Sequence, residues 1–336
     1  MKAMLLRRLH VIEPGRPPLH LEEVPDPVPD AGRLLIRVTA CGVCHTELDE
    51  IEGRTPLPRL PVIPGHQVVG TIVAGGDVGQ RVGVAWIHAA CGQCVYCRSG
   101  RENLCADFVA TGRDADGGYA QYITVPADFA FPLPRTISDA EAAPLLCAGA
   151  VGYRALKLAN LTDGAPLGLF GFGASNHLVL KTARHMYPGS SIMVFSRNPG
   201  ERKLARTLGA AWAGAIDEVS PQRLQAAIDA TPAWLPIVQA LRHLVPGGRL
   251  VVNAIRKEQE DKSELLGMDF DSHLWREKEV KSVANVTRAD VREFLDLASQ
   301  AGIRPEFQEY ELKDANRALQ DVRQGRIRGA KVLRVS

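Results

Sequence analysis

The stretch Cys41–Glu47 gathers more reactive chemistry than a packed core or a solvated loop normally needs. It reads Cys-Gly-Val-Cys-His-Thr-Glu, so thiol, imidazole, hydroxyl and carboxylate groups lie within seven residues. Thiolates and imidazoles are ligands that zinc prefers in proteins, and zinc takes four of them. One short stretch cannot close such a site, so the rest of the chain must supply the missing ligands and a partner for the metal's chemistry.

A second group of cysteines lies in a single loop. Cys91, Cys94, Cys97 and Cys105 have the spacing C-x2-C-x2-C-x7-C, and four thiolates can saturate one tetrahedral zinc ion and leave no position open for chemistry. This spacing predicts a structural zinc site. The alternatives are a disulfide pair, which a reducing compartment disfavours, an iron–sulfur cluster, whose usual last spacing is shorter, and a loop that folds with reduced thiols and no metal.

The remaining ligands indicate an open metal site. The other cysteines are Cys41, Cys44 and Cys147, and His66 lies in a Pro-Gly-His-Gln sequence. Two thiolates and one imidazole form a known catalytic zinc set with a fourth position open, at which the metal can polarise an oxygen-bearing substrate. Taken singly, each residue has a plainer interpretation as a packed thiol or a structural histidine.

A glycine-rich turn in the second half of the chain indicates a nucleotide site. An apolar strand is expected at 166–170, followed by Gly171-Phe-Gly-Ala-Ser-Asn176 and a helix. Gly171 allows a tight turn, Gly173 lets the backbone approach a pyrophosphate, and the helix start at Ala174 supplies amide donors. Asn176 replaces the third glycine of the usual fingerprint, and a plain strand–helix turn is the alternative.

The end of the next strand bears on the choice of coenzyme. The strand expected at 191–196 ends in Ser196-Arg197, Arg202 and Lys203 follow, and no acid stands at the strand end. An acid there binds the ribose 2′-hydroxyl of NAD, whereas a basic residue accommodates the 2′-phosphate of NADP. The pattern favours NADP(H), with NAD(H) as the alternative, since Arg197 can equally be a solvated residue at a helix start.

Two kinds of secondary structure are expected to position these groups. Short β-rich runs separated by glycines and long loops predict a β-barrel-type domain in the first half, with strands at 34–41, 68–74, 81–87 and 119–125. After about Cys147, alternating strands and helices predict an α/β domain with a parallel sheet of the Rossmann type, with strands at 166–170, 191–196 and 249–255 and helices at 174–187, 200–208 and 234–244. The polar run 256–264 is expected to be an exposed loop, and 289–300 a helix.

Together these features resemble the zinc-dependent alcohol dehydrogenases of the medium-chain dehydrogenase/reductase superfamily. The resemblance covers essentially the whole chain and is carried by Cys41–Thr46, Pro64–His66, the four-cysteine loop, Ala143–Gly149 and the turn at Gly171. It implies a GroES-like catalytic domain over 1–150 and 286–336, a Rossmann doubly wound domain over 151–285, and an active site in the cleft between them.

The resemblance implies a ligand set for the catalytic zinc. Cys44, His66 and Cys147 would hold the ion, which leaves Cys41 as a packed thiol. Glu47 would orient His66, as carboxylates beside metal-bound histidines do. The alternative for Glu47 is an exposed carboxylate on a helix.

Other residues have implied roles in the same reaction. Thr46 would accept the alcohol proton, His45 would approach the coenzyme pyrophosphate, and Trp86 would line the substrate pocket and favour slim substrates, unless it is ordinary core. Two positions depart from the family pattern: Gln67 stands where many relatives carry glutamate, and Asp49 where a histidine often ends the proton relay. We expect Asp49 to relay the proton or to leave that step to water.

A third departure lies near the C-terminus. Relatives often place an arginine on the pyrophosphate where this chain has Ala330. Arg328 or Lys331 could take that role, or the basic residues of this segment form a solvated face.

Bulk properties exclude several classes of protein. The 336 residues are 46% hydrophobic and 23% charged, with a net charge of +2, a balance that indicates neither nucleic acid nor an anionic membrane as a partner. The apolar run near Met1 is too short for a secretory signal, and no stretch approaches the roughly 18 apolar residues of a membrane helix. These features predict a cytoplasmic protein.

The sequence therefore predicts an alcohol dehydrogenase or aldehyde reductase. It would transfer hydride between a primary alcohol or aldehyde and a nicotinamide coenzyme, and would form a homodimer or homotetramer. A zinc-free quinone or enoyl reductase of the same superfamily is one alternative, since it needs no open-site ligands. A non-catalytic binding protein stabilised by the four-cysteine loop is the other.

Overall fold

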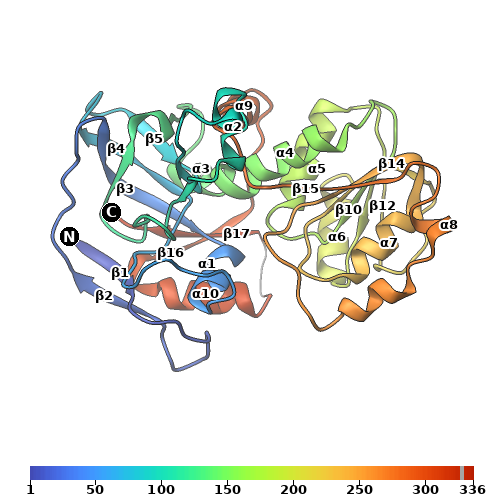
Figure 1. Cartoon of the computed structure of the whole chain (residues 1–336), viewed down its shortest axis with the longest axis horizontal. Helices are drawn as coiled ribbons and strands as arrows, with labels where there is room; N and C mark the ends of the chain where they lie inside the picture. The colour runs from blue at the N-terminus through green and yellow to red at the C-terminus, as the bar shows by residue number, and fades with distance from the viewer. Residues whose placement is uncertain (326–328) are drawn as a thin grey trace. The chain divides into compact units, whose positions relative to one another are not determined.

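The computed structural model describes residues 1–325 and 329–336, and this part of the chain divides into two compact units. The first unit comprises Met1–Ala150 and Asn285–Ser336, and the second Val151–Ala284 (Figure 1). Both ends of the chain therefore lie in the first unit.

The first unit is built on a seven-stranded, mainly antiparallel sheet. Its long strand β3 (Arg33–Val43) pairs with β4 (Val68–Ala74) along one edge, and with β8 (Tyr122–Pro126) and β17 (Ala330–Arg334) along the other. Alternate residues of β3 from Leu34 to Ala40 are buried, as in a strand with one face on the core. The sheet is completed by β5 (Arg81–Val84), β9 (Ala130–Pro132) and β16 (Phe307–Glu311). Two separate two-stranded antiparallel sheets accompany it, β1 (Lys2–Leu6) with β2 (Leu19–Glu23) and β6 (Ile87–Ala89) with β7 (Val109–Ala110).

The helices of this unit are mostly short, and some of them carry the reactive side chains. They are α1 (His45–Ile51), α2 (Val95–Arg98), α3 (Asp139–Pro144), α9 (Arg288–Gln300) and α10 (Ala315–Arg323), with 3-10 turns at Glu102–Leu104, Ala127–Phe129 and Leu312–Asp314. Helix α3 runs into a π-helical turn, Leu145–Gly149, which is followed by α4 (Ala150–Ala159). Such π-turns occur frequently at functional sites, and this one contains Cys147.

The second unit contains six parallel strands in the order β12-β11-β10-β13-β14-β15. Their bounds are β10 (Leu167–Phe170), β11 (Ile192–Phe195), β12 (Trp212–Gly214), β13 (Leu224–Asp229), β14 (Leu244–Val252) and β15 (Glu279–Ser282). Numbered along this unit, the order is 3-2-1-4-5-6, the Rossmann order, and it reverses between β10 and β13. The Rossmann part of the expected α/β fold is confirmed.

Helices cover both faces of this sheet, because successive side chains of its strands point to opposite faces and are apolar on both. Leu167 and Leu169 of β10 pack in one core cluster with α4, α5 (Asn176–Met186) and α6 (Pro199–Thr207). Phe170 belongs to a second cluster with α7 (Leu235–His243). The remaining helical segments are α8 (Phe270–His273) and a 3-10 stretch, Lys262–Gly267.

Two expectations for this unit were incomplete. Strands β12, β13 and β15 have no counterpart among the predicted strands, and β14 begins at Leu244 rather than Arg249. The run 256–264 is not simply exposed, because the Lys257 side chain is only 9% accessible and lies beside Asp229. Its polar residues form hydrogen bonds within the unit, which a sequence pattern of polar residues does not reveal.

Candidate active site

The four cysteines of the loop converge on one point. Their sulfur atoms all lie within 4.8 Å of one another, in the group Cys91, Cys94, Cys97 and Cys105. Backbone amides donate to these sulfurs, for example the Cys94 amide to Cys91 Sγ at 3.4 Å and the Cys97 amide to Cys94 Sγ at 3.5 Å. Amides of Gln93 and Cys94 contribute most to lowering the pKa of Cys91 to about 6. The loop therefore favours the thiolate, the ligand form of cysteine, at Cys91, whereas burial raises the pKa of the Cys97 thiol.

A second group of ligands forms in the same unit from three distant segments. Cys44 lies at the start of α1, His66 in the connection before β4, and Cys147 in the π-turn. His66 Nε2 lies 3.7 Å from Cys44 Sγ and 3.3 Å from Cys147 Sγ. Ligands of a tetrahedral zinc at normal bond lengths lie about 3.5–3.8 Å apart. The three side chains therefore fit one zinc ion, and within residues 1–325 and 329–336 no fourth metal-binding side chain joins this group.

Glu47 contacts His66 at Nδ1, the ring nitrogen that faces away from the two sulfurs. Glu47 Oε1 lies 2.5 Å from His66 Nδ1, and both side chains are almost fully buried. The second oxygen of Glu47 accepts the Cys44 amide at 2.8 Å, as part of a capping box on α1. Burial raises the pKa of Glu47, but His66 and the Cys44 amide outweigh it and lower that pKa below its usual value. An ionised Glu47 thus directs Nε2 of His66 toward the two sulfurs.

The other residues of the Cys41–Glu47 stretch have separate environments. Cys41 is fully buried on β3, and burial raises the pKa of its thiol. Thr46 lies in the first turn of α1 and is partly exposed, and His45 is exposed. Cys41 therefore lies outside the metal-ligand group, in keeping with a packed thiol.

Asp49 is not a surface acid. Its side chain is 7% accessible, and its carboxylate accepts the Arg54 Nε at 2.7 Å. Arg54 also pairs with Glu52. The residue that stands at the expected end of the proton relay is thus part of an ion-pair network.

Glu50 is a buried carboxylate that sequence reasoning missed. Its Oε1 accepts the indole Nε1 of Trp86 at 3.4 Å, and Trp86 packs against Phe108 with ring centroids 5.1 Å apart. Burial raises the pKa of Glu50 to about 8. No sequence signal distinguishes it from an exposed helix acid, because burial depends on the tertiary fold.

Gln67, also buried, packs over Gly42.

The glycine turn of the second unit has the backbone of a nucleotide-binding turn. Gly171 has φ +75, and a Cβ at this position would lie 2.6 Å from the Thr231 methyl group. A Cβ at Gly173 would meet nothing within 4 Å, so the backbone there is open to a ligand. Ala174 lies just before α5. Asn176, in place of the third glycine, donates to Phe170 O at 3.0 Å and Gly171 O at 2.8 Å, and so ties the helix start to the strand end.

The end of β11 combines basic and acidic groups. Arg197 and Lys203 are exposed, whereas Arg202 donates to the Ser196 carbonyl at 2.7 Å. The Ser196 hydroxyl donates to Glu201 at 2.5 Å. Sequence reasoning missed this acid, because Glu201 lies six residues beyond the end of β11 and reaches back from the first turn of α6.

Of the two basic residues considered for the pyrophosphate, one lies outside the described residues. That residue is Arg328. Lys331 is 1% accessible on β17 and donates to Gln308 Oε1 at 2.9 Å. Lys331 is therefore not part of a solvated basic face.

Comparisons with known proteins agree with this architecture. The alcohol dehydrogenase GroES-like domain family matches residues 30–135. A probable alcohol dehydrogenase of Mycobacterium tuberculosis is 44% identical over 99% of this chain and 97% of its own length. An alcohol dehydrogenase of Geobacillus stearothermophilus is 34% identical over 97% of this chain and 98% of its own.

Solved structures give the same result. A cinnamyl alcohol dehydrogenase of Sorghum bicolor superimposes with a TM-score of 0.85 at 26% identity, covering 99% of this chain and 97% of that one. An acetophenone reductase of Geotrichum candidum, solved in complex with NAD, superimposes with a TM-score of 0.84 at 26% identity and the same coverage. The chain belongs to the zinc-dependent alcohol dehydrogenase family of the medium-chain dehydrogenase/reductase superfamily. The GroES-like part of the expected fold is thereby confirmed.

Within residues 1–325 and 329–336, no helix combines the length and the apolar character needed to cross a bilayer.

Proposed function

We propose that the chain is a two-zinc alcohol dehydrogenase and aldehyde reductase that acts on primary alcohols and the corresponding aldehydes. The observation that carries the proposal is the convergence of Cys44, His66 and Cys147, with Glu47 on the far side of the histidine. These three ligands would hold the catalytic ion, and the four-cysteine loop would hold the structural one.

Several residues of α1 have a task in the proposed reaction. When bound, zinc supplies Lewis acidity toward the substrate oxygen, and a nicotinamide coenzyme supplies the hydride acceptor or donor. Thr46 takes the alcohol proton and passes it toward Asp49, while His45 contacts the coenzyme pyrophosphate. Trp86, held by Glu50, narrows the space for the substrate.

For the coenzyme, we propose NADP(H). Arg197 and Lys203 are exposed near the end of β11, where a 2′-phosphate would be bound. The Ser196–Glu201 hydrogen bond favours the second candidate, NAD(H), because a carboxylate at this place can accept the ribose 2′-hydroxyl and repels a phosphate.

We also propose that the protein works as a homo-oligomer, a dimer or a tetramer, through the outer edge of β15. All four residues of this strand are exposed, and within the described chain only β14 pairs with it. Val280 of this strand is 52% exposed, and Phe270 and Trp275, which precede the strand in the sequence, are 60% and 56% exposed. An open strand edge beside apolar groups is suited to pairing with a second copy.

One assay tests the proposed activity. Initial rates would be measured for several primary alcohols and aldehydes, each with NAD(H) and NADP(H), on protein of known zinc content. We expect turnover with both substrate classes and a higher kcat/KM with NADP(H). A clear preference for NADH would favour NAD(H) as the coenzyme, with Glu201 accepting the ribose 2′-hydroxyl. No turnover with any substrate would favour a non-catalytic binding protein.

A further inference from the structure

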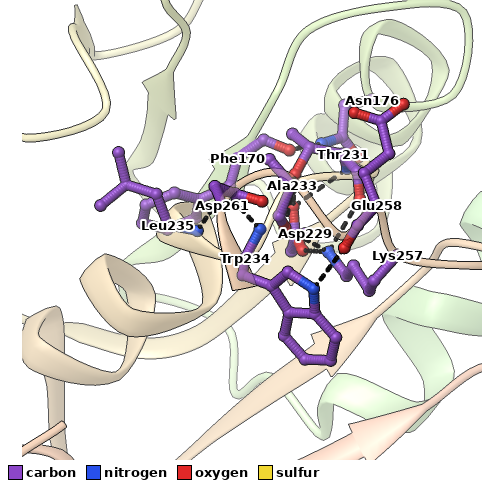
Figure 2. A network of polar contacts seen from close by, with 10 residues as sticks. All are labelled: Phe170, Asn176, Asp229, Thr231, Ala233, Trp234, Leu235, Lys257, Glu258 and Asp261. Carbon is purple, nitrogen blue, oxygen red and sulfur yellow. Dashed lines mark hydrogen bonds and ion pairs between the residues drawn. The ribbon is translucent and has the colours of Figure 1, made fainter. Parts of the chain in front are cut away.

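Lys257 is a nearly buried lysine whose three ammonium protons are all in use. It lies in the connection after β14, and its side chain is 9% accessible. The ammonium group pairs with Asp229 and donates to the carbonyls of Thr231 at 2.8 Å and Ala233 at 2.9 Å (Figure 2). Since an ammonium group has three donors and no acceptor, this side chain has no proton left for a ligand.

Asp229 completes the same arrangement from the end of β13. Its carboxylate is fully buried, and its Oδ1 accepts the Thr231 amide at 3.0 Å and the Thr231 hydroxyl at 2.8 Å. The turn at 229–233 is therefore held by its own aspartate and by the lysine of another connection. We refer to Asp229 and Lys257 as the turn clamp.

Further hydrogen bonds join the connection after β14 to the start of α7. The Asp261 carboxylate accepts the amides of Trp234 at 2.8 Å and Leu235 at 3.0 Å. The Trp234 indole donates to the Glu258 carbonyl at 2.6 Å, as Figure 2 shows. The two connections thus form one hydrogen-bonded layer, and an acid at a helix N-terminus adds favourable electrostatics.

This layer lies at the carboxyl end of the sheet, beside the point where the strand order reverses. The clamped turn follows β13, the Thr231 methyl group packs on Gly171, and the Ala230 amide donates to the Phe170 carbonyl at 3.1 Å. In a sheet of this order a dinucleotide lies across that point, with one mononucleotide half on each side. The connections after β13 and β14 belong to the nicotinamide side.

We propose that the turn clamp is a positioning device for the nicotinamide half of the coenzyme. A buried ion pair is a weak stabiliser, and well-packed apolar residues often serve stability as well or better. Here the ion pair fixes residues 229–233 in one conformation, packed on the glycine turn at Gly171. The proposal rests on the proposed use of a nicotinamide coenzyme.

The test compares binding of the whole coenzyme with binding of its adenosine half. Removing Lys257 alone would leave Asp229 buried without a counter-ion, so the main variant is the double substitution Asp229→Asn with Lys257→Met. The matched control is Lys262→Met, since Lys262 is an exposed lysine of the same region. Dissociation constants would be measured by calorimetry for NADPH and 2′-phospho-5′-AMP, and for NADH and 5′-AMP, on the zinc-loaded full chain.

The expected result is a split between the two kinds of ligand. The double variant should bind the reduced coenzyme at least tenfold more weakly, while its affinity for the adenosine half stays within about twofold of the parent, a change of under about 0.5 kcal/mol. Lys262→Met should match the parent for both. A folded double variant that binds the whole coenzyme like the parent overturns the proposal, and so does an equal loss for both ligands. If the parent binds neither NADH nor NADPH, the proposed function itself fails.

Discussion

At the residue level, three buried carboxylates on helix α1 have three different partners. Glu47 lies against His66, Asp49 against Arg54, and Glu50 against the Trp86 indole. His66 and the Cys44 amide lower the pKa of Glu47, whereas burial raises the pKa of Glu50, so these two carboxylates differ in their protonation.

The relay role of Asp49 can be tested by removing its charge. We expect Asp49→Asn to lower the rate of alcohol oxidation roughly tenfold to a hundredfold at neutral pH, because a side chain that passes protons contributes effects of that order or larger. Arg54→Met is the control, since it removes the ion-pair partner and keeps the carboxylate. Equal oxidation rates for Asp49→Asn and the parent across neutral pH would leave Asp49 as an anchor for Arg54 only.

The raised pKa of Glu50 predicts a stability change with pH. Its ordinary value of 4.5 rises to about 8 in the folded chain, so between these values the folded state holds a proton that the unfolded state releases. Folding stability contributed by this group therefore falls as pH rises from about 5 to 8. Relative to the parent, Glu50→Gln should gain about 3–5 kcal/mol over that interval.

Urea unfolding of zinc-loaded protein at both ends of that pH range measures the difference. Glu264→Gln, at an exposed position, is the matched control and should show no such change. A difference between Glu50→Gln and the parent that does not vary with pH would contradict a neutral Glu50 carboxyl group in the folded protein.

At the level of elements, the glycine turn can be tested with a matched pair of alanine variants. Gly171→Ala should cost about 1–3 kcal/mol of stability, because alanine is strained at φ +75 and its Cβ would lie 2.6 Å from the Thr231 methyl group. Gly173→Ala should fold like the parent, since nothing lies within 4 Å of its Cβ. Both should weaken coenzyme binding. Thermal unfolding and coenzyme titration separate the two effects, and a Gly173→Ala variant with parental coenzyme affinity would contradict a pyrophosphate at this turn.

Elements with a strong local pattern were predictable from the sequence, and those defined by distant partners were not. The strand β4 was predicted with its observed bounds, and α9 within one residue. The strand β13 was missed, because its Leu-Gln-Ala-Ala-Ile-Asp sequence has weak β character. With β13 unrecognised, Asp229 had no place in the fold, and its partner Lys257 is 28 residues away.

The candidate site follows the same division. The four-cysteine loop was visible from residue type and spacing, because zinc chemistry restricts both, whereas the choice of Cys44, His66 and Cys147 over Cys41 came from the family resemblance. Glu50 and Glu201 could not be recognised in this way. Glu50 matters because the fold buries it, and Glu201 because the Ser196 hydroxyl donates to it.

At the level of the whole molecule, the open edge of β15 predicts the assembly. Val280→Glu should shift the protein toward the monomer, because it replaces the exposed apolar side chain of that edge with a charge. Val219→Glu is the control, as Val219 is 84% exposed elsewhere in the same unit. Light scattering after size-exclusion chromatography measures the mass. A parent protein that is monomeric, or a Val280→Glu variant of parental mass, would contradict an assembly through this strand.

The central claim is that Cys44, His66 and Cys147 bind a zinc ion that the four-cysteine loop does not, and that this ion is needed for catalysis. The most direct measurement is the zinc content per chain of the purified parent and of Cys147→Ala, together with their rates of alcohol oxidation. We predict two zinc ions per chain in the active parent, and one in a folded Cys147→Ala variant that has lost alcohol oxidation. A parent with a single zinc ion per chain, or a Cys147→Ala variant that keeps both its second ion and its activity, would contradict the claim.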